Sequence, residues 1–181
     1  EGVPYVMETI RILRRAFAGR VPLIGFGGAP FTLACYMVEG KGSKDFAHIK
    51  KMMYAAPDVY AALMDKITEM DRLYLNAQVK AGAQAIQIFD TWGGIVSPTD
   101  YEKFILPYTT RLIEGLERSV PIIHFVKGAG TMLDLVKRAG SDVVGLDWHV
   151  NLGAARDTLG PKIAVQGNLD PTVLYAPHAH I

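Results

Sequence analysis

The sequence predicts an α/β protein in which parallel strands alternate with helices. Apolar runs that are typical of strands begin near positions 21, 84, 121, 142 and 162, with helix-like segments between them. A glycine separates helix from strand at Gly19, Gly82 and Gly140, where it suits the left-handed residue after a helix. Runs such as Ile122–Val126 are apolar at successive positions, as expected for a parallel sheet covered on both faces.

This alternation requires right-handed crossovers between neighbouring parallel strands. Five such units fit either a doubly wound sheet or most of a (β/α)8 TIM barrel, which needs eight strands and about 250 residues. No G-x-G-x-x-G or G-x-x-x-x-G-K-[ST] motif follows a strand, which weakens the nucleotide-binding form of the doubly wound sheet.

The individual elements follow from periodicity and from glycine and proline signals. The predicted helices are Pro4–Ala18, Ser43–Ala55, Pro57–Ala81, Ser97–Arg118, Thr131–Ala139 and Leu152–Leu159. The predicted strands are Val21–Phe26, Gln84–Phe89, Pro121–Val126, Asp142–Asp147 and Lys162–Gly167. The first helix keeps its apolar residues at positions 6, 10, 13 and 17. The third is expected to bury Val59, Leu63, Ile67, Met70 and Leu73.

The segment Gly25–Gly40 is the centre of the prediction. Gly27 and Gly28 are expected to take positive φ values and to turn the chain sharply out of its strand. The following residues are expected to form a wide loop that presents the hydroxyl of Tyr36. In parallel α/β folds, functional sites are built from loops after the carboxyl ends of strands.

Composition excludes several classes of function. The chain has 181 residues, a net charge of +1 and one cysteine, Cys35, which has no internal disulfide partner. The charge gives no support for nucleic-acid or membrane-surface binding, and no apolar run approaches the ~20 residues of a membrane helix. A cytoplasmic location is the simplest interpretation. The first and last residues, Glu1 and Ile181, give the expectation of a fragment.

The carboxyl ends of the predicted strands bring glycines, aromatic residues and single polar groups to one edge of the sheet. These clusters are Phe26-Gly27-Gly28, Phe89–Gly94, Val126-Lys127-Gly128, Leu146-Asp147-Trp148 and Gln166–Pro171. Such a mixture is typical of a largely apolar cleft with a few fixed donors and acceptors.

Each residue also has an ordinary structural interpretation. Tyr36 can be a half-buried tyrosine with a backbone partner, and Thr91 can cap the turn into Trp92. Asp147 and Asp170 fit loop organisers that accept backbone N–H groups. Lys127 fits an anion site or a surface lysine, while Phe26, Phe89 and His124 fit the core. No H-E-x-x-H, C-x-x-C or G-x-S-x-G motif occurs, so no metal site is predicted.

Four blocks of the sequence resemble the uroporphyrinogen decarboxylase family. The blocks are Gly25–Leu33 with Tyr36–Gly40, Gln87–Thr91, Val144–Trp148 and Gln166–Pro171. They occur in the family's order and extend over almost the whole chain. The resemblance implies a TIM barrel and a carboxy-lyase of haem biosynthesis, with no metal or organic cofactor. The implied reaction removes carbon dioxide from the four acetate side chains of uroporphyrinogen III and gives coproporphyrinogen III.

The resemblance also implies substrate-binding residues. Tyr36 matches a cleft tyrosine that hydrogen-bonds the substrate near the reacting acetate, and Thr91 matches a position that binds a substrate carboxylate. Phe26 and Phe89 match apolar cleft positions that pack against the macrocycle. A homodimer is expected from the family.

Three family features are missing from this chain. They are the N-terminal Arg-Gln-Ala-Gly-Arg block, the aspartate of the following strand and the histidine of a C-terminal Gly-His-Gly turn. By the family's pattern, residues 1–181 form one domain that holds strands three to seven and lacks the first two and the last. We therefore expect no certain catalytic residue here and no activity from this piece alone; the activity belongs to the parent protein.

Two alternatives stay open. A corrinoid or coenzyme-M-type methyltransferase on the same barrel would bind zinc through His-x-Cys after the fifth strand, where this chain has His124-Phe125-Val126. A truncated family member could instead act as a non-catalytic scaffold.

Overall fold

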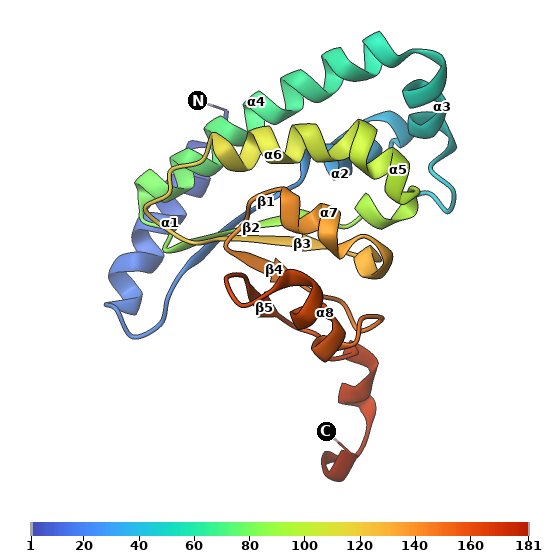
Figure 1. The fold of residues 1–181 in the computed structure, drawn as a ribbon. Coiled ribbons are helices and arrows are strands. Elements are labelled where there is room, and N and C mark those ends of the chain that lie inside the picture. Colours follow the sequence, from blue (N-terminus) through green and yellow to red (C-terminus); the bar gives the residue numbers. More distant parts are fainter. Residues whose placement is uncertain (1, 181) are drawn as a thin grey trace.

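The structure is a computed structural model that describes residues 2–180, and its centre is a sheet of five parallel strands (Figure 1). The strands are β1 (Ile24–Gly28), β2 (Ala85–Asp90), β3 (Ile122–Val126), β4 (Val143–Gly145) and β5 (Ala164–Gln166). Their order across the sheet equals their order in the chain, with β1 and β5 at the edges. A doubly wound sheet would reverse this order at a switch point. The predicted α/β class and the incomplete barrel are therefore confirmed.

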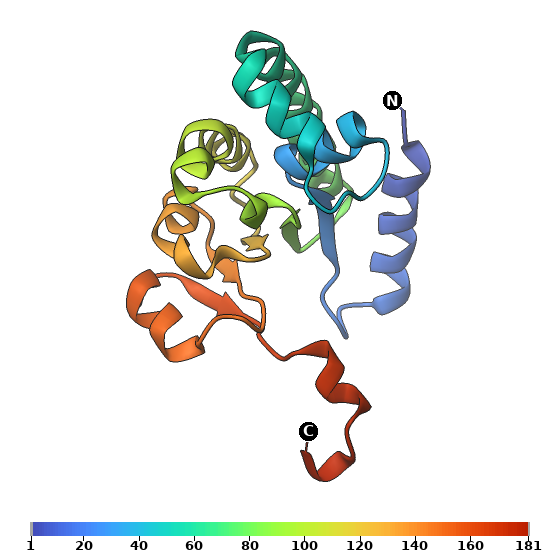
Figure 2. The ribbon, with the colours of Figure 1, turned by 90° about the vertical axis from the view of Figure 1, so that its right-hand side faces the viewer.

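Helices cover one face of this sheet, and α4 and α6 pack on each other there (Figures 1 and 2). The helices are α1 (Pro4–Phe17), α2 (Pro30–Glu39), α3 (Ala47–Ala55), α4 (Pro57–Ala81), α5 (Pro98–Asp100), α6 (Leu106–Glu114), α7 (Leu133–Arg138) and α8 (Leu152–Leu159). The last short helical turns, Pro171–Tyr175 and His178–His180, extend away from the sheet in both views.

Strand register divides the side chains of the sheet between two faces. The helix-covered face holds Ile86, Ile88, Asp90, Ile122, His124 and Val126, all of them buried. The open face holds Phe26, Gln87, Phe89, Phe125 and Gln166, which are exposed or half-buried. Alternate residues of a strand point to opposite faces, so neighbours such as Ile88 and Phe89 have different surroundings.

The prediction for Gly27 and Gly28 is wrong. Both lie within β1, and neither has a positive φ. Glycine is needed here for close packing instead: a Cβ at Gly27 would lie 3.0 Å from the Leu75 side chain of α4, and one at Gly28 would lie 2.8 Å from Leu33 of α2. The strand therefore continues through both glycines and brings the helices close to the sheet.

The wide loop expected after β1 is also wrong, because Pro30 begins α2 instead of only ending the strand. Proline suits the first turn of a helix, where its missing N–H has no intrahelical partner in any case. The next helix, α3, begins at Ala47 rather than Ser43. The Ser43 hydroxyl accepts a hydrogen bond from the Phe46 N–H at 3.1 Å, which organises the turn before the helix.

The single helix predicted over residues 97–118 is divided into α5, a π-helical turn at Tyr101–Ile105, and α6, which ends at Glu114. Pro107 explains the irregularity, because a proline inside a helix removes one backbone donor and displaces the carbonyl one turn earlier. The remaining predicted elements are present, with ends that differ by a few residues.

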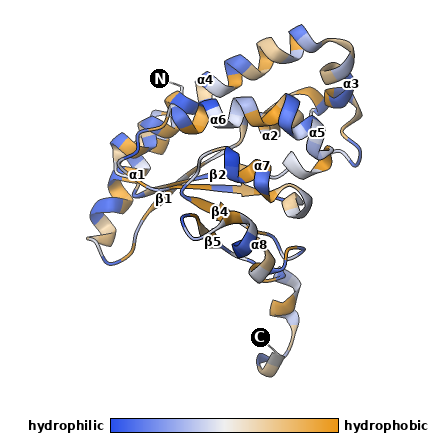
Figure 3. Cartoon of the chain, in the orientation of Figure 1, coloured by the Kyte–Doolittle hydropathy of each residue, from blue (hydrophilic) through white to orange (hydrophobic). Residues whose placement is uncertain are grey.

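The buried side of α4 differs from the predicted one. Along its length α4 carries both apolar and polar positions (Figure 3). Tyr60, Met64, Ile67, Asp71, Leu75 and Gln78 are buried, whereas Val59, Met70 and Leu73 are exposed. The prediction failed because two polar residues, Asp71 and Gln78, occupy the side that faces the protein interior.

Candidate functional site

Tyr36 lies on α2, one helical turn after Thr32. The start of this helix is fixed to the neighbouring strand, because the Ala29 N–H donates to the Phe89 carbonyl at 2.8 Å. Thr32 is buried, whereas Tyr36 is 43% exposed. The helix thus presents the tyrosine at the carboxyl end of β1, from a helical turn rather than from the predicted loop.

Trp92 brings Tyr36 and Thr91 together. The rings of Tyr36 and Trp92 meet edge to face, with their centroids 6.0 Å apart, and Phe46 packs on the same indole at 4.6 Å. Thr91 directly precedes Trp92 in the turn after β2. Among residues 2–180, neither the Tyr36 nor the Thr91 hydroxyl has an intramolecular hydrogen bond. Neither hydroxyl is therefore used to hold the described part of the fold together.

Three phenylalanines form an aromatic row across the open face. Phe26 and Phe89 meet edge to face at 6.0 Å between centroids, and Phe89 meets Phe125 at 6.1 Å. Phe26 is 62% exposed, so the row is accessible. The core interpretation of Phe26 is wrong for the described residues, and the row offers an apolar surface to a flat ligand.

Gln78 holds the backbone of Phe26 in place. Its side-chain Oε1 accepts from the Phe26 N–H at 3.0 Å, and its Nε2 donates to the Phe26 carbonyl at 2.8 Å. A Cβ at Gly25 would lie 2.6 Å from Gln78 Oε1, so the glycine leaves the space that this amide occupies. The buried glutamine of α4 thus ties the helix layer to the strand that carries the aromatic row.

Asp90 forms a buried network between α2 and the turn after β2. The Thr32 hydroxyl donates to Asp90 Oδ1 at 2.9 Å, and the Trp92 N–H donates to Thr32 Oγ1 at 3.2 Å. Burial raises the pKa of Asp90 to about 7, against the lowering effect of hydrogen bonds from Thr32 and the Gly93 backbone. The turn after β2 is therefore organised by Thr32 rather than by the Thr91 hydroxyl.

The loops after β3 and β4 are organised around Asp147. This buried carboxylate accepts from the backbone N–H groups of Gly128 and His149, which confirms it as a loop organiser. Asp170 likewise accepts from the Thr172 backbone, a bond that lowers the pKa of Asp170. The Lys127 ammonium lies 5.8 Å from the centre of the Trp148 ring.

His124 lies on the helix-covered face and is fully buried. Burial lowers the pKa of His124 to about 4, so the ring is neutral at pH 7. The core interpretation is confirmed, but neither ring nitrogen has a hydrogen-bond partner within the described residues. Across residues 2–180, no three His, Cys, Asp or Glu side chains lie close enough together to hold a metal ion.

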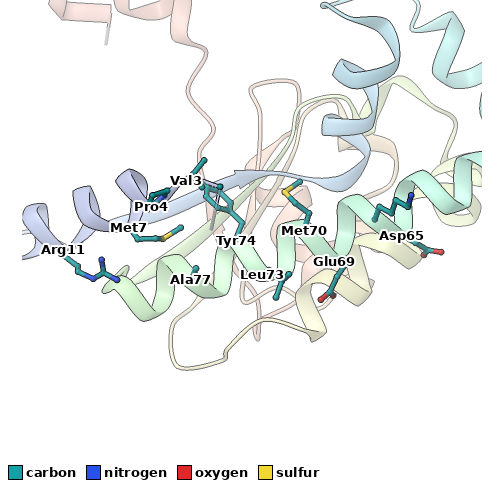
Figure 4. A pocket seen from close by; sticks show the side chains of 12 residues that line it. Val3, Pro4, Met7, Arg11, Asp65, Glu69, Met70, Leu73, Tyr74 and Ala77 are labelled. Atoms are coloured by element: carbon teal, nitrogen blue, oxygen red, sulfur yellow. The ribbon is translucent and has the colours of Figure 1, made fainter.

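A groove of about 1010 Å³ lies elsewhere, between α1 and α4 (Figure 4). Its apolar lining includes Val3, Met7, Met70 and Leu73, and its edge carries Arg11 and Glu69. None of Tyr36, Thr91, Phe26 and Phe89 lines it, so this groove is separate from the carboxyl ends of the strands.

Comparison with known proteins identifies the family. The sequence model described as "Uroporphyrinogen decarboxylase (URO-D)" matches residues 1–181. The chain belongs to the uroporphyrinogen decarboxylase family. It is 80% identical over 178 residues to the uroporphyrinogen decarboxylase of Geobacter sulfurreducens, covering 98% of this chain and 52% of the relative. Against the enzyme of Trichlorobacter lovleyi it is 77% identical, covering 99% and 53%. The chain spans about half the length of the curated relatives it matches.

A solved structure supports the fold of this uroporphyrinogen decarboxylase family member. A methyltransferase from Methanosarcina mazei matches with a TM-score of 0.86 and 22% sequence identity, covering 97% of this chain and 51% of that one. At this identity the likeness concerns the fold alone. Within residues 2–180, none of the helices combines the length and the hydropathy that a membrane span requires.

Sequence reasoning missed the residues that support the predicted ones. Thr32, Gln78 and Asp90 are buried and polar, and none belongs to a recognised catalytic motif. Strand alternation could have located Asp90, because it lies one residue from both Phe89 and Thr91 and points to the opposite face. Thr32 and Gln78 could be found only once the helices were placed against the sheet.

Proposed function

We propose that this chain is part of an enzyme that decarboxylates uroporphyrinogen III to coproporphyrinogen III. The observation that carries the proposal is the match of the family model to residues 1–181, together with 80% identity to a relative named for this activity. The chain represents about half of such an enzyme, so the activity is that of the longer protein.

The chemistry requires no group beyond protein and substrate. Each acetate side chain loses carbon dioxide and gains a proton, so that a carboxymethyl group becomes a methyl group. A pyrrole ring protonated beside the reacting side chain accepts the electron pair of the breaking C–C bond. The enzyme's task is then to orient the substrate and to stabilise a transient cation, which is positional and electrostatic catalysis.

In this proposal, the aromatic candidate residues bind the macrocycle and the hydroxyl-bearing ones bind its carboxylates. The aromatic row of Phe26, Phe89 and Phe125 packs against the apolar macrocycle. The ring of Tyr36 meets Trp92, and Thr91 precedes Trp92 in the chain; the hydroxyls of Tyr36 and Thr91 donate hydrogen bonds to substrate carboxylates. A hydrogen bond to a charged group contributes about 1.5–3 kcal/mol, so two such contacts select one orientation of the substrate.

The methyltransferase alternative has no support beyond the fold. The related solved structure carries that name, but its 22% identity transfers only architecture. At the two positions where that chemistry would place its His-x-Cys ligand pair, this chain has His124 and Val126, and both are buried on the helix-covered face. Val126 has no side-chain atom that can bind a metal ion.

Three further predictions belong to the same proposal. Residues 1–181 form one domain that supplies strands three to seven of the barrel. The complete enzyme is a homodimer in the cytoplasm. Sedimentation of the full-length protein and cell fractionation test the last two statements.

The decisive experiment is turnover of uroporphyrinogen III by the full-length protein under anaerobic, reducing conditions with no added cofactor. We expect the four acetate carboxylates to be lost one after another. Chromatography of the oxidised porphyrins measures the product of each step. A correctly folded full-length protein that leaves the substrate unchanged would contradict the proposal and favour a non-catalytic scaffold.

A further inference from the structure

We infer that Asp90 is a positioning residue of the proposed site: through Thr32 it fixes α2, and with it Tyr36, against the turn that carries Thr91 and Trp92. The inference rests on the proposed function for its kinetic consequences. Its geometric part, the placement of Tyr36 and Trp92, can be tested without that function.

Asp90 lies between two candidate substrate-binding residues, Phe89 and Thr91, but on the opposite face of the strand. It pairs with Val126 in the register of the helix-covered face and is fully buried. Its side chain therefore does not reach a ligand on the open face. What it reaches instead is the first turn of α2, where the Thr32 hydroxyl donates to Asp90 Oδ1 at 2.9 Å.

Thr32 joins the two halves of the site. One hydroxyl donates to Asp90 and accepts from the Trp92 N–H at 3.2 Å. Tyr36 follows Thr32 by one helical turn, and its ring contacts the Trp92 indole with a centroid separation of 6.0 Å. Movement of Thr32 relative to Asp90 would therefore change the position of Tyr36 relative to the Thr91–Trp92 turn.

The cost of burying this carboxylate supports a specific role. An ionisable group without solvent is expensive, and an apolar side chain of similar size would pack at lower cost. The surroundings are also shaped for it, since a Cβ at Gly93 would lie 2.6 Å from Asp90 Oδ2. Burial raises the pKa of Tyr101 and of Cys35, and the charge of Asp90 raises both further.

The expected effect is on catalysis more than on folding. Small displacements of groups that orient a substrate can lower rates by about a hundredfold. In the full-length enzyme we expect Thr32→Val, which keeps the shape but removes the hydroxyl, to lower kcat/KM by roughly ten- to a hundredfold. Thr32→Ser restores the hydroxyl and is expected to stay within about threefold of the wild type.

The matched control is Thr68→Val. Thr68 is also a buried threonine, but its hydroxyl bonds only to the Met64 carbonyl of its own helix, α4. Its removal disturbs the core in a similar way but breaks no hydrogen bond to α2 or to the turn after β2. Asp90→Ala is the direct variant, but it leaves a cavity and carries a risk of misfolding, so the threonine series decides the question.

A double-mutant cycle distinguishes positioning from general destabilisation. If Thr32 acts through Tyr36, Thr32→Val in a Tyr36→Phe background should lower kcat/KM by less than about threefold, because the contact it positions is already lost. A full-sized loss in that background, or the same loss from Thr68→Val, would overturn the inference.

A spectroscopic measurement separates this inference from the proposed function. In a variant that retains Trp92 as its only tryptophan, Thr32→Val should shift the emission maximum and increase acrylamide quenching, whereas Thr68→Val should do neither. If the wild type shows no decarboxylation, the proposed function fails, yet this shift would still support the anchoring role of Thr32 and Asp90. An unchanged Trp92 signal in Thr32→Val would overturn it.

Discussion

The two faces of the sheet differ in how their side chains are used, although the same strands build both. On the helix-covered face, Ile86, Ile88 and Ile122 are fully buried, and the polar Asp90 is bonded within the protein. On the open face, Phe26, Phe89 and Phe125 remain accessible and contact mainly one another. Within the described residues, one face is closed by packed helices and the other is open, which is consistent with the proposed contact between the open face and a ligand.

Neighbouring residues of β2 provide the strongest test of this contrast. In the chain of residues 1–181, Ile88→Ala should lower stability by about 4 kcal/mol, because it leaves a cavity in a closed core. Phe89→Ala removes a larger side chain but should cost less than half as much, since its ring is only partly covered. Urea denaturation measures both. Equal losses would show that the open face is as closely packed as the other and would break the comparison.

The second test uses Asp71, a carboxylate buried on the inner side of α4. Burial raises the pKa of Asp71 from 3.8 to about 8, so the folded protein holds a proton that the unfolded chain releases near pH 4. Stability from this group is present below pH 4 and is lost as the pH rises toward 8. Asp71→Asn does not titrate, and its advantage over the wild type should therefore grow by about 5 kcal/mol between pH 4 and pH 9.

Denaturation midpoints measured across this pH range check the prediction. Asp157→Asn, which alters an exposed carboxylate of α8, is the matched control and should follow the wild-type curve. Asp90 and His124 titrate in the wild type and in both variants. Their contributions therefore cancel when the stability of each variant is compared with that of the wild type. A constant difference between Asp71→Asn and the wild type would mean that Asp71 is hydrated and ionised in the folded protein.

The third test concerns the link between the two faces. Gln78→Leu keeps the size of the side chain but leaves the N–H and the carbonyl of Phe26 without the partners that Gln78 provides. An unpaired backbone group costs about 1–3 kcal/mol, so we expect a loss of about 2 kcal/mol in stability. The KM for uroporphyrinogen should rise as well, because the aromatic row loses its fixed backbone at Phe26. A rise in KM without any loss of stability would contradict this account.

Local sequence signals predicted where the strands lie. They predicted less well which neighbours surround a given residue. Alternation and the glycines at 19, 82 and 140 correctly predicted five parallel strands. The α2 error arose because Gly27 and Gly28 fit a turn as well as a close approach between strand and helix, and only the positions of Leu75 and Leu33 decide between them. The buried side of α4 was misplaced because hydrophobicity cannot reveal that Asp71 and Gln78 lie inside.

The sequence predicted the candidate residues that would contact a ligand, but not the buried residues that hold them in place. Tyr36, Thr91, Phe26 and Phe89 belong to sequence blocks that resemble a known family, and the structure places them at the carboxyl ends of β1 and β2 or in the aromatic row. The residues that hold them, such as Thr32, make bonds across long sequence separations. Those bonds depend on the packing of helices against the sheet, which no local pattern encodes.

The smallest effect expected in free energy is that of Tyr36→Phe, and it separates function from stability most cleanly. The Tyr36 hydroxyl has no hydrogen bond within residues 2–180, so its removal should leave the unfolding midpoint unchanged. If that hydroxyl donates to a substrate carboxylate, kcat/KM should fall at least about tenfold, which corresponds to about 1.4 kcal/mol of transition-state stabilisation. Tyr54→Phe is the matched control, because Tyr54 donates to Asp100 away from the aromatic row. The Tyr54 hydroxyl makes a hydrogen bond within the protein, so Tyr54→Phe should reduce stability slightly and leave turnover unchanged. If Tyr36→Phe instead lowered stability without affecting turnover, Tyr36 would belong with the residues that maintain the fold, and the carboxylate contact would have to come from Thr91 alone.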